Sequence, residues 1–326
     1  MSITRDTLQK LNRYEEAAKR FDGVKRLFVD TTTPEMQKAF AALTPKFIEV
    51  EGIDVTKLRE EYYRRQSNYD TAPFDPEGRQ FRMFPGGVTI WSGFPGSGKT
   101  TLLRQLACHL LHKGRGVFVA SLEEQPDDML FRLMQTAAGS EQPSEHQCQW
   151  MLDAYGERLR IWGMVGIAKV GEVLATVRSL SEQGIRHAII DSLTCLDVGS
   201  GDWEGQRMLA NQLVSLARAT GTHIHLVAHP RKPSAGQSSP DIADIAGSSD
   251  LGRLVDNVLF VRRSTDESLR YEDATPMMVM VRKQRHGTGM CGEITGWFHR
   301  TRRQFSELQR AQEVIRYLPE NAYEAA

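Results

Sequence analysis

The sequence lacks the features that mark secreted, zinc-stabilised or membrane proteins. It holds only 4 cysteines in 326 residues and no C-x-x-C pair, which argues against a zinc ribbon and a disulfide framework. No run approaches the roughly 20 apolar residues that a membrane-spanning helix needs, and the first residues form no apolar signal core. We therefore expect a protein with no membrane partner, in a soluble intracellular compartment such as a bacterial or phage cytoplasm or an organelle matrix.

An excess of charge of one sign is absent as well. Lysine and arginine together number 41, and so do aspartate and glutamate, so the net charge is zero. This balance excludes a generally basic nucleic-acid coat but leaves room for a local basic patch facing DNA or RNA. The sequence also shows no internal repeat and no long low-complexity tract, and its length suffices for one large or two modest domains.

The most informative feature that is present is a complete phosphate-binding loop at residues 93–100. The octapeptide Gly-Phe-Pro-Gly-Ser-Gly-Lys-Thr fits the pattern G-x-x-x-x-G-K-[ST]. An apolar run typical of a buried strand, residues 87–92, precedes it, and residues 101–107, typical of a helix, follow it. This strand–loop–helix order is the context that the motif requires. The sequence therefore predicts a bound nucleotide.

Each residue type in this loop has a physical role in holding phosphate. Glycines let backbone N–H groups approach the phosphate oxygens, and the helix N-terminus adds the positive end of its dipole. Lys99 would reach the β- and γ-phosphates, and the hydroxyl of Thr100 would bind Mg²⁺. The expected cofactors are therefore ATP and Mg²⁺. The expected nucleotide contacts are Gly93, Pro95, Gly96, Ser97, Gly98, Lys99, Thr100 and Thr101.

The order of strand-like and helix-like segments predicts an α/β fold. Strands and helices alternate after the loop, as in a mostly parallel sheet flanked by helices. The last strand-like stretches, residues 277–282, 293–299 and 304–307, follow one another directly and predict antiparallel strands at the sheet edge. We expect the nucleotide-binding core at residues 84–310. The other predicted parts are a small α/β N-terminal region at residues 1–67, a linker at 68–83 and a C-terminal tail at 311–326.

Two acidic positions are candidates for the hydrolytic chemistry. Asp191 ends an apolar strand, where an open α/β sheet has its ligand crevice, and it could hold Mg²⁺ directly or through water. Glu123 follows the second strand of the core and could polarise the attacking water. The alternatives are an acid that caps a helix for Asp191 and a solvated first-turn glutamate for Glu123, a description that fits Glu124 better.

A third candidate, His229, leads into a long irregular segment. His229 ends a strand and could contact the γ-phosphate and report its presence to residues 231–250, although a structural strand-end histidine is the alternative. A loop of that length inside a compact domain is usually functional or disordered. It begins with the cations Arg231 and Lys232 and contains the small residues Gly247 and Ser248, which suits a grip on a nucleic-acid backbone without base reading.

Two further cations, Lys283 and Arg285, lie at the end of a predicted strand. Residues two apart on a strand point to the same side, so both could stabilise charge on a γ-phosphate in the manner of an arginine finger. The spacing alone fits a solvated cationic strand end equally well.

Taken together, residues 84–308 resemble the RecA-type core of the ring-forming replicative helicases, the group of the DnaB helicases, the helicase half of phage primase-helicases and Twinkle. Ser-Leu-Glu-Glu at 121–124 resembles the strand with the catalytic glutamate, and Ile-Ile-Asp-Ser at 189–192 resembles the Walker B strand. Val-Ala-His-Pro-Arg-Lys at 227–232 is most similar to the Twinkle and phage branch. Residues 244–248 and 256–259 resemble the central DNA-binding loop and the strand after it.

The resemblance has implications beyond the motifs themselves. Lys-Gln-Arg-His-Gly at 283–287 matches the K-x-R finger motif, which in this family acts on the nucleotide of the neighbouring subunit. It therefore implies a homo-oligomeric ring, of hexameric size, around single-stranded DNA, with a separate primase or polymerase as a further partner. Phe298 matches the position whose ring stacks on the base, and Arg263 is expected to flank it.

The N-terminal region departs from this family. No primase zinc module is present, and residues 25–55 resemble the end of a Toprim fold without its acidic cluster. The helix expected near residues 54–66 is a candidate for the linker helix that docks on the next subunit.

Three functions remain in competition. The leading one is an ATP-driven replicative DNA helicase that hydrolyses ATP between the subunits of a ring. The second is a recombination ATPase of the RecA or RadA type that forms filaments on DNA, against which the K-x-R-H-G element argues. The third is a regulatory nucleotide-binding module that unwinds nothing.

Overall fold

The computed structural model describes residues 53–199, 201–230, 241–245, 249–264, 266–287, 291–307 and 315–323. The chain divides into two units, Met1–Arg59 and Glu60–Ala326, and each is considered by itself. The elements expected before residue 53, including the Toprim-like segment, lie outside the described residues. Of the first unit, the structure describes residues 53–59. They include the start of helix α4 (Val55–Ser67), which crosses the boundary between the units.

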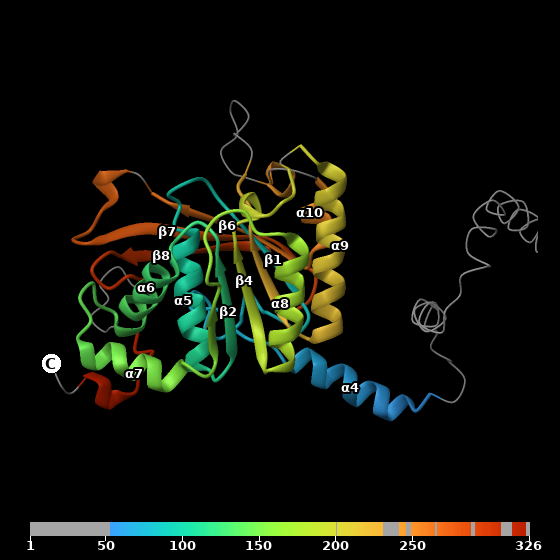
Figure 1. The fold of residues 1–326 in the computed structure, drawn as a ribbon, viewed down its shortest axis with the longest axis horizontal. Helices are drawn as coiled ribbons and strands as arrows, with labels where there is room; N and C mark the ends of the chain where they lie inside the picture. The colour runs from blue at the N-terminus through green and yellow to red at the C-terminus, as the bar shows by residue number, and fades with distance from the viewer. Residues whose placement is uncertain are drawn as a thin grey trace, which may run out of the picture. The chain divides into compact units, whose positions relative to one another are not determined.

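One mixed sheet forms the centre of the second unit (Figure 1). Among the described residues its strand order is β3-β2-β4-β5-β1-β6-β7-β8-β9. The first six strands in this order are parallel, and β7, β8 and β9 add to β6 in antiparallel fashion. The strands are β1 (Val88–Ser92), β2 (Gly116–Ser121), β3 (Leu159–Ile161), β4 (Ile185–Asp191), β5 (His223–Val227), β6 (Asn257–Arg263), β7 (Ala274–Gln284), β8 (Gly292–His299) and β9 (Gln304–Ser306).

Helices cover both faces of the sheet, which explains why the central parallel strands are apolar nearly throughout. One face packs on α5 (Lys99–His112), α6 (Pro126–Ala138) and α7 (Glu145–Tyr155). The other packs on α8 (Val170–Glu182), α9 (Trp203–Thr220) and α10 (Ser249–Leu254). All five residues of β1 are buried. The predicted fold class, a RecA-like mostly parallel sheet with antiparallel edge strands, is therefore confirmed. None of the described helices has the length and apolar character to cross a membrane.

Helix α7 has no counterpart among the elements expected from the sequence. Its sequence signal is the capping box of Ser144 and Gln147, in which each side chain bonds the backbone N–H of the other residue. The helix buries only Met151 and Tyr155, so its apolar periodicity is weak.

Residues 68–83, expected as a linker, pack into the core. Four of their side chains, Ala72, Phe74, Phe81 and Met83, are fully buried, and Phe74 and Phe81 both meet the ring of Trp91 edge-on. Two prolines and the lack of a helical or strand period hide this role in the sequence, because irregular backbone can still bury aromatic rings. The described part of the tail, residues 315–323, packs on the face of the sheet that α5 covers, through Tyr317 and Leu318.

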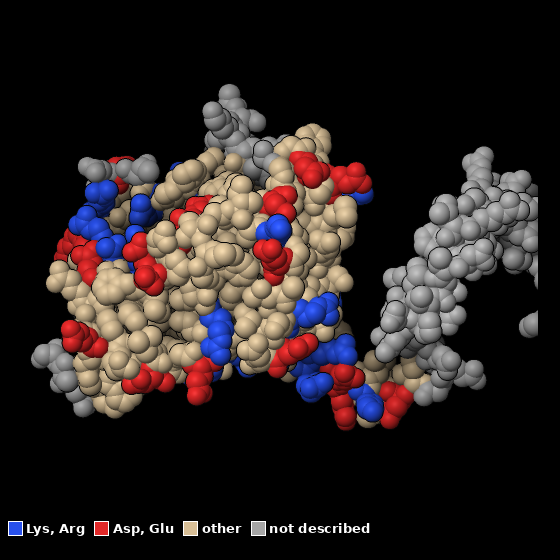
Figure 2. All heavy atoms as spheres, viewed as in Figure 1, with Lys and Arg blue, Asp and Glu red and all other residues tan. Residues whose placement is uncertain are grey.

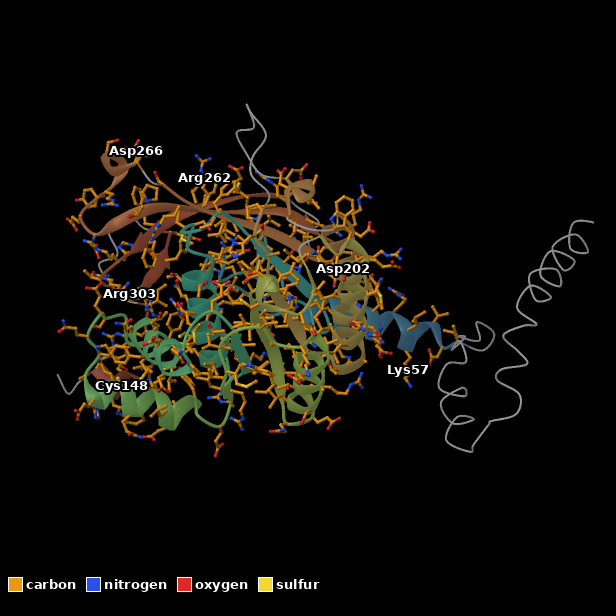
Figure 3. All side chains as sticks on the ribbon, turned by 45° about the horizontal axis from the view of Figure 1, so that its top comes forward. Lys57, Cys148, Asp202, Arg262, Asp266 and Arg303 are labelled. Atoms are coloured by element: carbon orange, nitrogen blue, oxygen red, sulfur yellow. The ribbon has the colours of Figure 1, made fainter. Side chains whose placement is uncertain are left out.

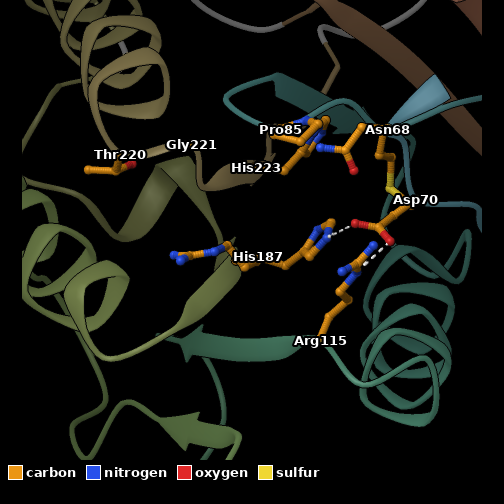
Figure 4. Close-up of a pocket in the computed structure, with 10 residues that line it drawn as sticks. Asn68, Asp70, Pro85, Arg115, His187, Thr220, Gly221 and His223 are labelled. Atoms are coloured by element: carbon orange, nitrogen blue, oxygen red, sulfur yellow. Dashed lines mark hydrogen bonds and ion pairs between the residues drawn. The ribbon is translucent and has the colours of Figure 1, made fainter. Parts of the chain in front are cut away.

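Three histidines, His187, His223 and His225, form a cluster near the amino-terminal ends of the parallel strands, with ring centroids 4.7, 5.4 and 5.7 Å apart. His187 lies between Asp70 and His225, with distances of 3.1 Å from its ring nitrogens to each. The indole N–H of Trp91 donates to His225, and His223 bonds the carbonyl oxygen of Phe84. Figure 4 shows His187 and Arg115 converging on Asp70 beside a cavity of about 280 Å³. These bonds satisfy imidazoles that are buried in the core.

Helix α4 itself carries acidic and basic residues side by side, visible as interspersed red and blue in Figure 2. It buries no residue, and Val55, Leu58, Tyr62 and Tyr63 are all more than half exposed. The helix was expected at residues 54–66 and is observed within one residue of those bounds. Its docking on a neighbouring subunit stays a prediction.

Candidate nucleotide-binding site

The phosphate-binding loop connects the buried strand β1 to the first turn of α5, as the motif predicts. Gly98 caps the helix with φ of 96°, a left-handed conformation that favours glycine. A Cβ atom there would lie 3.1 Å from the end of the Met277 side chain on β7, and one on Gly93 would collide with the carbonyl oxygen of Val261. The left-handed backbone at Gly98 and the collision with backbone at Gly93 therefore favour glycine at these two positions.

Within the loop, the described groups fit a nucleotide phosphate. The ammonium group of Lys99 donates to the carbonyl oxygens of Gly93 (2.7 Å) and Phe94 (3.2 Å), so it lies folded over the loop. Burial lowers the pKa of Lys99, although the carboxylates of Asp191 and Glu123 oppose this shift. The hydroxyl oxygen of Ser97 is buried and makes no hydrogen bond within the described structure. A desolvated cation and an unpartnered hydroxyl in a glycine cradle are features that an anion would complete. Pro95, Gly96 and Thr101 lie in the same loop and first helical turn.

Thr100 and Asp191 lie together at the carboxyl end of the parallel strands. The Thr100 hydroxyl donates a 2.6 Å hydrogen bond to the Asp191 carboxylate, which ends β4. Burial raises the pKa of Asp191, while the hydrogen bond from Thr100 acts in the opposite sense. A hydroxyl and a carboxylate oxygen in contact are a donor set suited to Mg²⁺, which takes oxygen ligands. The structure thus brings the two residues of the predicted metal site together.

Glu123 follows β2 at the same edge, and two hydroxyl groups from the end of β4 surround its carboxylate. Ser192 donates to its Oε1 atom at 2.6 Å, and Thr194 lies 3.5 Å from the same atom. The Nε2 atom of His229, just beyond β5, lies 3.9 Å from Oε1. Burial lowers the pKa of His229, and its Nδ1 atom is buried without a partner in the described structure. The carboxyl ends of the parallel strands therefore carry Glu123, Asp191, His229 and the phosphate-binding loop together, as predicted.

The expected DNA-binding residues are not placed by the structure. Arg231, Lys232, Gly247 and Ser248 lie outside the described residues. Their described neighbours are Pro230 and Ile245, which form an antiparallel bridge directly after His229.

Lys283 and Arg285 lie toward the amino-terminal ends of the parallel strands. The phosphate-binding loop of the same chain lies at the carboxyl ends. Met280 on β7 is level with Ser92, the last residue of β1, through their shared partner Phe260. Because β7 runs antiparallel to β6, Lys283 pairs with Val258, which is level with Ile90 on β1. Lys283 therefore lies two strand residues, or about 7 Å, farther from the loop than Ser92 does. Its ammonium group donates to the carbonyl oxygens of Gly252 and Arg253 at the end of α10.

The buried carboxylate of Asp256 holds Arg285 at this edge. Arg285 and His286 each lie 3.6 Å from it, and Arg218 lies 2.6 Å from it. Burial, followed by the positive charge of Arg285, lowers the pKa of Lys283 to about 8. The two predicted finger residues thus lie side by side.

The side chain of Phe298 is buried in this structure. It is 6% exposed and packs in the core opposite Phe305, so its burial does not support a stacking role. Arg263 and its neighbour Arg262 are exposed at the end of β6, and their side chains make no hydrogen bond or ion pair in the described part of the chain. Both line a cavity of about 590 Å³ together with Trp297 and Met277. Figure 3 shows Arg262 and Asp266 at this edge of the molecule.

Four residues of the site were not anticipated from the sequence. Ser192 and Thr194 contact Glu123, Arg104 binds Glu124, and Trp297 lines the cavity beside Arg263. Ser192 directly follows Asp191 in the sequence, so its position beside the predicted metal site could have been inferred from the sequence. Trp297 precedes Phe298 on β8, and neighbouring residues on a strand point to opposite faces. Nothing in the sequence indicates the pairing of Arg104 with Glu124.

Comparison with known proteins gives a match to a family model, to a curated relative and to solved structures. A family described as an AAA domain matches residues 76–235. The chloroplastic/mitochondrial Twinkle homolog protein of Arabidopsis thaliana is 23% identical over 251 residues, which cover 70% of this chain and 35% of the relative. The chain thus spans about a third of that relative's length.

Two solved structures share the fold. One, described as an ATPase domain, matches with a TM-score of 0.67 and 18% identity, over 80% of this chain and 100% of that one. A DnaB-like replicative helicase, described with its interactions with primase, matches with a TM-score of 0.67 and 17% identity, over 93% of this chain and 79% of that one. The chain therefore has the RecA-type fold of the ATPase domains of DnaB-like replicative helicases, and it resembles this family in sequence as its motifs predicted.

Proposed function

We propose that this protein is an ATP-dependent replicative DNA helicase that moves along single-stranded DNA as a ring and hydrolyses ATP between its subunits. The observation that carries the proposal is the separation of Lys283 and Arg285 from the phosphate-binding loop of the same chain. The loop, the metal-binding pair and Glu123 occupy one edge of the sheet, and the two finger cations occupy the other. In this arrangement the two cations of one subunit complete the nucleotide site of a neighbouring subunit and not the site of their own chain.

The residues at the loop edge divide the work of hydrolysis. Lys99 leaves the carbonyl oxygens of the loop and binds the β- and γ-phosphates of ATP. Thr100 and Asp191 would hold Mg²⁺, which when bound neutralises charge on these phosphates. Glu123, oriented by Ser192, aligns and polarises the attacking water.

A neighbouring subunit supplies the remaining positive charge. Its Lys283 and Arg285 stabilise the charge that develops on the γ-phosphate, which in other phosphoryl-transfer enzymes accelerates hydrolysis by about 10³–10⁵. A head-to-tail contact of this kind closes into a ring when its rotation permits and otherwise forms an open filament. We propose the closed ring, of hexameric size, with ATP as the nucleotide.

Hydrolysis is coupled to DNA through the segment after β5. His229 lies within 3.9 Å of Glu123 and directly precedes residues 231–250. We propose that this segment, with Arg231, Lys232, Gly247 and Ser248, grips the phosphate backbone of single-stranded DNA. Such contacts are independent of sequence and weaken with salt. Arg263 is proposed to contact the nucleotide base, with the partly exposed ring of Trp297 beside it.

The decisive experiment is strand separation of a forked DNA duplex by the purified protein with ATP. The Glu123→Gln variant, which should bind ATP without hydrolysing it, is the matched control. Unwinding by the wild type alone supports the proposal. Hydrolysis that single-stranded DNA stimulates, without unwinding, would make the protein a translocase or loader. Binding without any hydrolysis would indicate a regulatory module, and filaments instead of rings in electron micrographs would indicate a recombination ATPase.

A further inference from the structure

The two adjacent glutamates after β2 are held by two different elements. Glu123 accepts a hydrogen bond from Ser192 at the end of β4. Glu124 instead binds Arg104 of α5, whose Nη2 atom lies 2.6 Å and 2.5 Å from its two carboxylate oxygens. Because the two residues share a peptide bond, a displacement of Glu124 moves the backbone that carries Glu123.

Arg104 belongs to the helix that begins at the phosphate-binding loop. It lies four residues after Thr100, so both side chains leave α5 on the same face. Thr100 binds Asp191 at the end of β4, and Arg104 binds Glu124 just beyond β2. Thr100, Arg104 and Asp191 also line one small void of about 10 Å³. One face of α5 thus holds the ends of both strands that carry acidic site residues.

The Arg104–Glu124 pair is too enclosed to be an ordinary surface ion pair. The side chain of Arg104 is 8% exposed and that of Glu124 is 28% exposed. The Nε atom of Arg104 is buried and has no partner in the described structure. A buried guanidinium that loses its carboxylate leaves an uncompensated charge, which is costly. The pair is therefore expected to persist when α5 moves.

We propose that Arg104 and Glu124 are positioning residues that transmit the state of the phosphate-binding loop to Glu123. The inference rests on the proposed hydrolysis and concerns how the general base is aligned for it. When the loop and the start of α5 adjust to a bound nucleotide, Arg104 carries Glu124 with it, and Glu123 moves with its neighbour. Neither residue touches the reacting atoms.

The test compares Glu124→Gln, which keeps shape and removes charge, with Glu172→Gln, which removes one partner of an exposed ion pair on α8. A misplacement of the base by about 1 Å can cost up to 10²-fold in rate. We expect kcat for ATP hydrolysis to fall about tenfold or more in Glu124→Gln, with KM for ATP within about twofold of wild type. Glu172→Gln should match the wild type. Arg104→Lys, which keeps the charge but not the contact with both carboxylate oxygens, should lower kcat less than Glu124→Gln does.

Two outcomes would overturn the inference. One is an unchanged kcat in Glu124→Gln, with only a lower melting temperature, because the pair would then be purely structural. The other comes from a crystal structure of Glu124→Gln in which Glu123 keeps its 2.6 Å contact with Ser192 and its wild-type position with a bound ATP analogue. This second measurement needs no activity. If the wild type itself fails to hydrolyse ATP, the proposed function fails, and the crystal structure still decides the positioning role.

Discussion

The hydroxyl group of Ser192 donates a 2.6 Å hydrogen bond to the carboxylate of Glu123 and lies 2.5 Å from the hydroxyl of Thr194. Ser192 is fully buried. Ser192, the residue after Asp191, therefore holds the carboxylate of Glu123 in place. It connects the proposed metal site and the proposed water-activating site through a single peptide unit.

Replacing Ser192 by alanine should slow hydrolysis without preventing nucleotide binding. A hydrogen bond to a charged group contributes about 1.5–3 kcal/mol, so we expect kcat to fall about tenfold or more while the affinity for ATP is retained. Thr194→Ala removes a contact of 3.5 Å and should have a smaller effect. Steady-state hydrolysis and binding of a fluorescent ATP analogue would measure both. Equal effects of the two variants would contradict the role of Ser192.

Mixing two inactive variants should restore activity if the site is shared between subunits. Lys99→Ala disables the loop edge, and Arg285→Ala disables the finger edge. In an equal mixture about a quarter of head-to-tail interfaces join an intact loop to an intact finger. ATP hydrolysis should recover to about that fraction of the wild-type rate. Recovery should be absent when either variant is mixed with the double variant, and absence of recovery in the main mixture would exclude a site completed by the neighbouring subunit.

The rate of hydrolysis should fall as the pH rises through about 8. The pKa of Lys283 is lowered to about 8, by burial first and by Arg285 second. Lys283 carries its positive charge below that pH and loses it above, so its contribution to charge stabilisation is present at pH 7 and lost by pH 9. The pH profile of kcat/KM reports groups of the free enzyme. The alkaline limb should move to higher pH in Lys283→Arg, and an unmoved limb would assign it to another group.

Substitutions of Trp297 and Phe298 should differ in their effects, one on nucleotide binding and the other on the stability of the fold. Phe298 is buried in the core, so Phe298→Ala should lower the free energy of unfolding by about 3–5 kcal/mol. Trp297 lines the cavity beside Arg263, so Trp297→Ala should weaken nucleotide binding severalfold at a smaller cost in stability. Urea denaturation and titration with a fluorescent nucleotide would test the pair. The opposite pattern would restore Phe298 as the base contact.

Stability should fall steeply in mild acid because buried imidazoles must stay neutral. Burial lowers the pKa of His223 to about 3 and that of His109 to about 4. The unfolded chain binds these protons near pH 6.5 and the folded chain does not, so the stabilisation is complete above pH 6.5 and is lost as the pH falls toward 4. Each imidazole contributes about 1.4 kcal/mol per pH unit in this window. Urea denaturation between pH 7 and 4.5 measures the slope, which His223→Gln should reduce and His146→Gln, at an exposed position, should not.

Residues close together in sequence determined much of the site. The octapeptide at residues 93–100 predicts its own strand, loop and helix, because glycine placement and apolar periodicity are local properties. Asp191 and Glu123 were predicted from their places at strand ends, and the parallel sheet brings those ends to one edge. The alternation of strands and helices likewise predicted the fold class without any knowledge of contacts.

Only the tertiary structure decided which side chains meet across long stretches of chain. The pairing of Arg104 with Glu124, the burial of Phe298 in place of Trp297 and the packing of residues 68–83 all depend on which face of the sheet a residue points to. The antiparallel register of β7 decided the most consequential point, because it moves Lys283 and Arg285 away from their own loop. Sequence motifs name the candidate residues of the site, but strand direction separates Lys283 from the loop of its own chain, and this separation is the basis for the proposal that two copies supply one site.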